Sequence, residues 1–99
     1  MSFSTADHSV NPPNIDVPRM YNAAVDLVER NLAARTGKLA YIDDTGQYTF
    51  GELSERVNRF GSGLLSLGLQ MEQRVLIAML DTIDWPVAFL GAIKAGIVP

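Results

Sequence analysis

Residues 74–99, with the sequence RVLIAMLDTIDWPVAFLGAIKAGIVP, decide the fold class. Six consecutive apolar residues, 75–80, show no polar alternation, which is typical of a strand buried on both faces in a parallel sheet. A helix is predicted after this strand, and residues 97–99 begin a second apolar strand. Strand, helix and strand start predict a right-handed βαβ crossover that is cut off at its second strand. The sequence therefore predicts an α/β protein that is truncated.

The predicted crossover helix has recognisable end signals. Asp81 or Thr82 can cap its start, Pro86 is tolerated in its first turn, and Gly96 can end it. Its apolar stripe is expected to consist of Trp85, Ala88, Phe89, Ala92 and Ile93.

A helix and a β-hairpin are predicted in the first half of the chain. Apolar residues at helical spacing predict the helix from about residue 22 to residue 35, with Gly37 as a left-handed residue at its end. The stripe of this helix is Tyr21, Val25, Val28 and Leu32. A strand over residues 38–43, a turn at 44–46 and a return strand at 47–49 form the predicted hairpin.

The best-marked helix begins at Thr49. Thr49 and Glu52 form the capping-box pattern, in which each side chain accepts a hydrogen bond from a backbone N–H near the other. Gly68 is placed to end the helix, while Gly61 and Gly63 indicate close packing, since each costs about 1 kcal/mol relative to Ala. The core-facing stripe is expected to be Leu53, Val57, Phe60, Leu64 and Leu67. The expected surface ion pairs are Glu52 with Arg56 and Glu55 with Arg59.

Composition excludes several function classes. The 99 residues contain 8 Lys and Arg against 11 Asp and Glu, a net charge of −3, so a basic face for nucleic acid is not expected. The absence of Cys and the single His8 exclude thiol chemistry and multi-histidine metal sites. Residues 1–19 contain no secretory signal and are predicted to be an irregular lead-in. Three charged residues argue against a membrane span over residues 75–98, so a cytoplasmic protein without membrane contact is expected.

Asp81 and Asp84 are the most interesting candidates for a ligand site, because α/β folds bind ligands at the carboxyl ends of parallel strands. A helix cap and a partner for the helix dipole nevertheless explain both residues without a ligand. Asp43 and Asp44 are adjacent carboxylates that fit a turn.

Gly91 and Gly96 have the glycine spacing of a phosphate loop, but Ile97 and Val98 stand where that loop needs Lys and Ser or Thr. The two glycines also lie inside and after a helix instead of before one, so packing and capping roles are predicted for them. Core packing is likewise predicted for Trp85 with Phe89. No catalytic, cofactor-binding or metal-binding residue is therefore predicted among residues 1–99.

Two motifs resemble those of adenylate-forming enzymes, the superfamily of acyl-CoA synthetases, luciferases and nonribosomal adenylation domains. YTFGEL at residues 48–53 resembles the first core motif, and IKAGIVP at residues 93–99 resembles the second, cut at its proline. Within the superfamily, YNAA at residues 21–24 and MLDT at residues 79–82 are most similar to benzoate–CoA ligases. The resemblance extends from about residue 18 to residue 99.

The resemblance implies that residues 20–99 are the truncated start of the large N-terminal domain of a benzoate–CoA ligase-like enzyme. The expected architecture is helix, β-hairpin, helix and then a βα unit entering a parallel sheet. Such enzymes convert a carboxylate and ATP to an acyl-adenylate and pyrophosphate, and the thiol of CoA then displaces AMP. ATP, CoA and Mg²⁺ are the implied cofactors of the full-length enzyme, and a small aromatic carboxylate is the implied substrate.

The resemblance also implies that the remainder of the parent chain carries the site. In this family the phosphate loop, the aryl pocket and the catalytic lysine lie beyond the second motif, so Lys94 is not expected to be that lysine. The 99 residues alone are expected to bind no cofactor and to be inactive and marginally stable. The alternative is a standalone small α/β interaction or regulatory module without catalysis.

Overall fold

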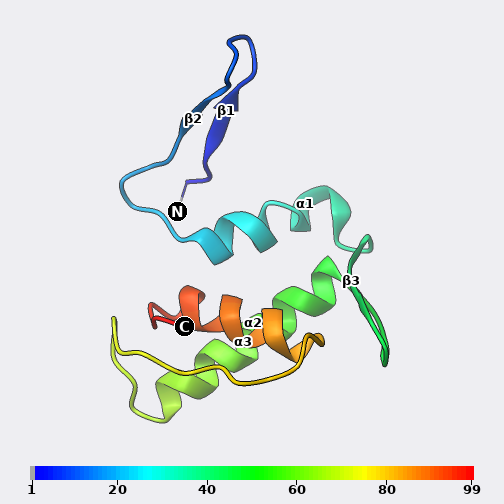
Figure 1. Cartoon of the computed structure of the whole chain (residues 1–99), viewed down its shortest axis with the longest axis vertical. Coiled ribbons are helices and arrows are strands. Elements are labelled where there is room, and N and C mark those ends of the chain that lie inside the picture. The colour runs from blue at the N-terminus through cyan, green and yellow to red at the C-terminus, as the bar shows by residue number, and fades with distance from the viewer. Residues whose placement is uncertain (1) are drawn as a thin grey trace.

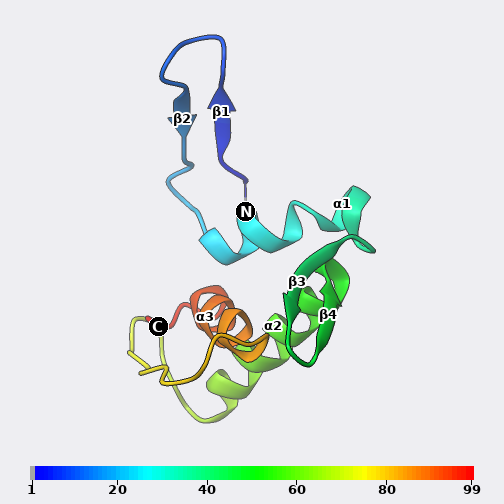
Figure 2. The same cartoon turned by 45° about the vertical axis from the view of Figure 1, so that its right-hand side comes forward.

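A computed structural model describes residues 2–99, in which the helices α2 (Phe50–Ser66) and α3 (Asp84–Lys94) pack against each other (Figure 1). The hairpin of β3 (Leu39–Asp43) and β4 (Gly46–Thr49) lies at the start of α2, and the hairpin of β1 (Thr5–Asp7) and β2 (Asn14–Asp16) projects away from the other elements (Figure 2). The predicted mixture of helices and strands is confirmed, with two small antiparallel sheets. In chain order the elements are β1 (Thr5–Asp7), β2 (Asn14–Asp16), the π-helix η1 (Val25–Glu29), α1 (Leu32–Arg35), β3 (Leu39–Asp43), β4 (Gly46–Thr49), α2 (Phe50–Ser66) and α3 (Asp84–Lys94).

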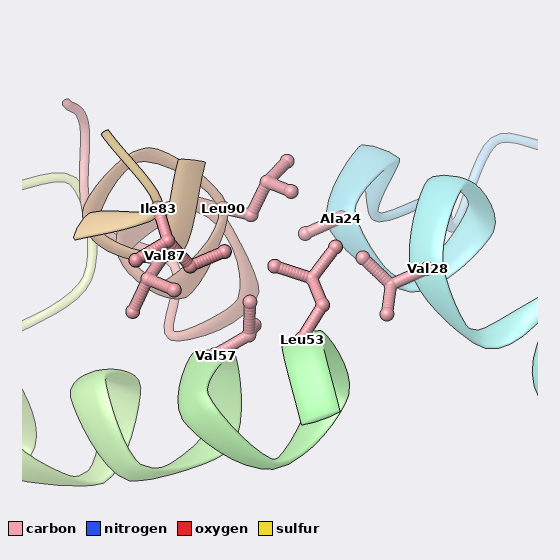
Figure 3. Packing of buried hydrophobic residues seen from close by; sticks show 7 residues of the cluster. All are labelled: Ala24, Val28, Leu53, Val57, Ile83, Val87 and Leu90. Carbon is pink, nitrogen blue, oxygen red and sulfur yellow. The ribbon is translucent and has the colours of Figure 1, made fainter. Parts of the chain in front are cut away.

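The main core lies where α2, α3 and the helical residues 24–28 meet (Figure 3). The stripe predicted for α2 is confirmed at Leu53, Val57 and Leu64, which are buried. The prediction for Leu67 is wrong, since its side chain is 80% exposed just beyond the last residue of α2. The buried side chains of this core are Ala24, Val28, Leu53, Val57, Ile83, Val87 and Leu90.

Helix α3 is buried on a wider face than its predicted stripe. Ala88 and Ala92 are buried as predicted, but Val87 and Leu90 are buried as well. The core position predicted for Trp85 is wrong, since Trp85 is 37% exposed and belongs to neither core cluster. Figure 3 shows α2 on one side of α3 and the residues around Ala24 on another, and two packing partners cover more of a helix than a single stripe.

Glycines allow α2 and α3 to approach closely. A Cβ on Gly61 would lie 3.0 Å from the carbonyl oxygen of Gly91, and a Cβ on Gly91 would lie 2.9 Å from Phe60 and 3.1 Å from the carbonyl oxygen of Val57. The predicted packing roles of Gly61 and Gly91 are therefore confirmed. The prediction for Gly63 is wrong, because a Cβ there would meet nothing within 4 Å.

Two of the three predicted C-terminal glycines have left-handed backbone. Gly68 after α2 has a φ of 88° and Gly96 after α3 has a φ of 81°, values that glycine adopts without strain. Gly37 has no positive φ, so its prediction is wrong. The chain leaves α1 instead through a turn in which the Lys38 N–H donates to the carbonyl of Arg35 at 2.9 Å.

The helix predicted over residues 22–35 is divided in two. A π-helix, η1, precedes the short α1, and the Asn31 N–H donates to the carbonyl of Val28 at 3.1 Å between them. The wider π turn shifts the hydrogen-bond register, so one continuous apolar stripe is not maintained. Val28 of the predicted stripe is buried, and Asp26, which lay outside it, is also buried.

The lead-in is more regular than predicted. Residues 5–7 and 14–16 pair as the antiparallel strands β1 and β2, and all six of these residues are exposed. Asp7 orders the connecting turn, because its Oδ1 accepts hydrogen bonds from the Ser9 N–H and hydroxyl at 2.9 and 2.6 Å. This pairing could not be predicted from the sequence, because neither strand has an alternating apolar pattern.

The β3–β4 hairpin confirms the predicted strand pair, with a bulge between Leu39 and Tyr41. At its end, Thr49 caps α2 by accepting a hydrogen bond from the Glu52 N–H at 3.2 Å. The reciprocal half of the capping box differs, because the Glu52 carboxylate accepts from the Thr49 hydroxyl at 3.1 Å. Glu55 pairs with Arg59 as predicted. Arg56 lies over the ring of Tyr48, 5.0 Å from its centre, in place of the predicted pair with Glu52.

The strand predicted at residues 75–80 does not form in this chain, since these residues have no regular secondary structure and belong to no sheet within residues 2–99. One parallel bridge joins Arg74 to Val98, supported by the Val75 N–H donating to the Val98 carbonyl at 2.9 Å. The pairing expected for a βαβ crossover is therefore present at a single point. Leu76 is 94% and Leu80 83% exposed, so the prediction of burial on both faces is wrong for this chain by itself.

Candidate functional site

The sequence placed its candidate ligand site where residues 75–80 lead into α3, and the structure brings five side chains together there. The Tyr41 hydroxyl of β3 donates to Asp81 Oδ1 at 2.5 Å. Asp43, two residues along β3, accepts from the Ile83 N–H at 2.8 Å through Oδ2. Met79, Asp81 and Trp85 line a shallow pocket of about 290 Å³ beside these contacts.

Of the roles predicted for Asp81 and Asp84, the helix cap at Asp81 is wrong and the first-turn position of Asp84 is confirmed. Asp81 does not cap α3, because its carboxylate accepts from Tyr41. Ile83 is the N-cap, and the Thr82 hydroxyl oxygen accepts from the Asp84 N–H at 3.3 Å. Asp84 is exposed in the first turn of α3, where a carboxylate is stabilised by the helix dipole.

Asp43 confirms the predicted turn role and adds a second one. Its Oδ1 accepts hydrogen bonds from the Thr45 N–H and hydroxyl, both at 2.8 Å, and from the Gly46 N–H at 3.0 Å. Its Oδ2 reaches across to Ile83 at the start of α3. One carboxylate therefore orders the β3–β4 turn and fixes that turn to α3.

These contacts shift two pKa values at the site. The hydrogen bond to Asp81 raises the pKa of Tyr41 to about 12, because it stabilises the protonated phenol. The backbone N–H of Ile83 and then the hydroxyl of Thr45 lower the pKa of Asp43, because both donate to the charged form. Both shifts arise from bonds within the protein, as expected for groups that connect elements.

The remaining candidates lie in structural contacts. Trp85 and Phe89 stack with ring centres 4.9 Å apart and an angle of 13° between the planes. The Lys94 ammonium donates to Glu29 and to Asn58, each at 2.5 Å, and so connects α3 with η1 and α2. His8 is exposed in the turn between β1 and β2.

Asp26 is the polar centre that the sequence analysis missed. It is 5% exposed and accepts hydrogen bonds from Ser4, Tyr21 and Arg30. A pocket of about 410 Å³ adjoins these side chains. The signal in the sequence was an acidic residue within an apolar helix, with Arg30 one helical turn later.

Within residues 2–99, no three His, Cys, Asp or Glu side chains lie close enough together to hold a metal ion. Over the same residues, no helix is long and apolar enough to cross a membrane. The glycines at 91 and 96 leave no phosphate loop before a helix, since Gly91 is inside α3 and Gly96 follows it.

The chain matches a known protein family over most of its length. The AMP-binding enzyme family matches residues 28–99. The chain belongs to this family. The adenylate-forming resemblance of the two core motifs is thereby confirmed, since both motifs lie within the matched residues.

Two relatives that are at least 50% identical to this chain are ligases of aromatic acids. A benzoate–CoA ligase of Thauera aromatica is 59% identical over 100 residues, which cover 99% of the chain and 19% of the relative. A 4-hydroxybenzoate–CoA/benzoate–CoA ligase of Rhodopseudomonas palustris is 50% identical over 82 residues, which cover 82% of the chain and 15% of the relative. The chain thus spans less than a fifth of the length of these curated relatives.

Two solved structures of CoA ligases have a fold similar to that of this chain. A benzoate CoA ligase from Burkholderia xenovorans LB400 superposes with a TM-score of 0.77 at 55% identity, over 81% of the chain and 16% of the solved one. An anthranilate CoA ligase in complex with anthranoyl-AMP superposes with a TM-score of 0.78 at 36% identity, over 83% of the chain and 16% of the solved one. Most of the chain therefore has the fold of a part of such an enzyme.

Proposed function

We propose that this chain is the N-terminal part of an ATP-dependent ligase that joins benzoate, or a closely related aromatic acid, to CoA. The observation that carries the proposal is the 59% identity to the Thauera benzoate–CoA ligase across 99% of the chain. In the proposed reaction the carboxylate attacks ATP to give an acyl-adenylate and pyrophosphate. The thiol of CoA then displaces AMP to give the thioester. A cytoplasmic location, where ATP and CoA are available, belongs to the same proposal.

The proposal assigns the binding of ATP, CoA and Mg²⁺ to the rest of the enzyme. The carboxylates of Asp43 and Asp81 are engaged by Ile83 and Tyr41, and the described residues contain no cluster for a metal ion. These residues do not fit a nucleotide or Mg²⁺ site. The proposed role of residues 2–99 is to form one corner of the large domain, and the chain alone is proposed to be inactive.

Residues 75–80 support the assignment to a larger domain. They follow directly on the parallel bridge at Arg74, and Leu76 and Leu80 are almost fully exposed. An apolar segment of this kind is typical of an inner strand of a parallel sheet, which needs a neighbour on each edge and a helix on each face. We assign the missing neighbours to the remainder of the enzyme.

A chimera tests the proposed function. The matching N-terminal segment of the Thauera enzyme is replaced by this chain, and thioester formation is measured with benzoate, ATP, Mg²⁺ and CoA. We expect the chimera to be active, and we expect neither the Thauera enzyme without that segment nor the 99-residue chain alone to release pyrophosphate. A folded chimera that cannot activate benzoate contradicts the proposal.

A substrate panel extends the same test. Substituted benzoates and short fatty acids are compared with benzoate in the chimera and in the intact Thauera enzyme. Because the proposal places the acid pocket outside residues 2–99, the order of preference is expected to be the same in both proteins. Benzoate-dependent pyrophosphate release by the 99-residue chain would contradict the predicted inactivity of that chain.

A further inference from the structure

Residues 4–21 form an arm whose two ends meet at one atom of η1. The Ser4 hydroxyl and N–H donate to Asp26 Oδ2 at 2.6 and 3.1 Å. The Tyr21 hydroxyl donates to the same oxygen at 2.5 Å. Between these two residues the arm carries β1 and β2, whose residues are all exposed and which project from the body (Figure 2). A single carboxylate oxygen therefore holds both ends of the arm.

Arg30 also binds the start of the arm. Its Nε donates to Asp26 Oδ1 at 2.8 Å, and its Nη2 donates to the Ser4 carbonyl at 2.7 Å. The ring of Phe3 lies 5.2 Å from the guanidinium carbon of Arg30, within the range of a cation–π contact. Ser4 is thus bound through its N–H, its hydroxyl and its carbonyl by two side chains of one helix turn.

We propose that Asp26 is the anchor of this arm, so that residues 4–21 act as a strap that is docked through Ser4 and detaches when the Asp26 contacts are removed. An ionised carboxylate accepts hydrogen bonds on both oxygens, and bonds to a charged group are stronger than neutral ones. The strap needs such an anchor, because two strands of three residues each are marginal as an isolated hairpin.

The surroundings of Asp26 keep the anchor charged. The titratable groups in contact with it are Tyr21 and Arg30, and the hydroxyl of Ser4 also donates to it. The bonds from Ser4 and then Tyr21 hold the pKa of Asp26 well below its usual range. The docked state of the strap is therefore maintained through neutral and mildly acidic pH.

Hydrogen exchange of the Ser4 amide in the 99-residue chain tests the anchor. Asp26→Asn is expected to speed this exchange by about tenfold or more, because a hydrogen bond to a charged acceptor is lost. The matched control is Asp7→Asn, since Asp7 binds the N–H and hydroxyl of Ser9 in the same way but only within the arm. The control is expected to leave the Ser4 amide protected. An unprotected Ser4 amide in the unaltered chain, or equal effects of the two variants, overturns the proposal.

A second pair of variants spares the helix and its core. Ser4→Pro removes both donors to Asp26, and Ser9→Pro removes the equivalent pair of donors to Asp7. Trypsin is expected to cleave after Arg19 about tenfold faster in the Ser4 variant than in the unaltered chain, and at an unchanged rate in the Ser9 variant. Equal rates in both variants overturn the anchor. Neither experiment reads ligase activity, so the strap and the proposed function can fail separately.

Discussion

At Gly91 the absence of a side chain is a packing requirement. A Cβ at this position would lie 2.9 Å from Phe60 and 3.1 Å from the carbonyl oxygen of Val57, which is backbone and cannot rotate away. We predict that Gly91→Ala destabilises the chain by about 1 kcal/mol or more, because overpacking of roughly 1–3 kcal/mol exceeds the helix propensity that alanine gains. Urea unfolding followed by circular dichroism measures the difference.

Gly63 provides the matched control for Gly91. It is also inside a helix, but a Cβ there would meet nothing within 4 Å. Gly63→Ala is therefore expected to stabilise the chain by about 0.5–1 kcal/mol through propensity alone. Equal stabilisation by both alanine substitutions would contradict the close approach of α2 and α3 at Gly91.

The phenol of Tyr41 is expected to lose its proton at an unusually high pH. Its hydrogen bond to Asp81 raises the pKa to about 12 from an ordinary value of 10.0, so its contribution to stability is complete below pH 10 and is lost as the pH rises through about 12. Asp81→Asn is predicted to lower the pKa of Tyr41 toward the ordinary value. Ultraviolet difference titration measures tyrosinate formation, and Tyr41→Phe identifies the signal. An unchanged titration in the Asp81 variant contradicts this assignment.

Among the elements, those with local signals were predictable from the sequence. Thr49 marks the start of α2 and Gly68 its end, because capping and left-handed backbone depend on a few neighbouring residues. Contacts between distant segments were not predictable. The bond from Asp43 to Ile83 spans 40 residues, and Ser4 reaches Asp26 across 22. No periodicity within one segment contains that information.

The contact from Asp43 to Ile83 joins two elements, and acid is expected to weaken it. The pKa of Asp43 is lowered in the folded chain, so its stabilising effect is present above the ordinary value of 3.8 and is lost as the pH falls through the lower folded value. We predict that Asp43→Asn lowers the urea midpoint at neutral pH and that its difference from the unaltered chain narrows in acid below pH 3.8.

Asp44→Asn is the control for this pH dependence. Asp44 is the exposed neighbour of Asp43 in the same turn, and its substitution also removes one negative charge. It is expected to leave the urea midpoint nearly unchanged at both pH values, since surface substitutions usually stay within about 0.5 kcal/mol. Equal effects at the two positions would indicate that net charge, and not the bond to Ile83, governs the pH dependence.

For the molecule as a whole, residues 74–99 correctly predicted the α/β class but wrongly predicted that residues 75–80 are buried in this chain. A continuous apolar run indicates a strand that has neighbours, and it does not indicate where those neighbours come from. Within residues 2–99 the run meets one parallel bridge and remains exposed. The pattern therefore describes the environment of the segment in a larger sheet, and this is the environment that the proposed function assigns to it.

A charged substitution in residues 75–80 is expected to be tolerated in the isolated chain and harmful in the chimera. Leu76 is 94% exposed, so Leu76→Lys is expected to change the unfolding free energy of the 99-residue chain by less than about 0.5 kcal/mol. In the chimera the same lysine would be buried without a partner, which is costly, so ligase activity should be lost. Urea unfolding of the isolated chain and thioester assays of the chimera measure the two outcomes. Leu53→Lys, at a buried core position, should unfold the isolated chain and so calibrates the first measurement. A chimera that keeps full activity with Lys at position 76 contradicts the placement of residues 75–80 inside a sheet.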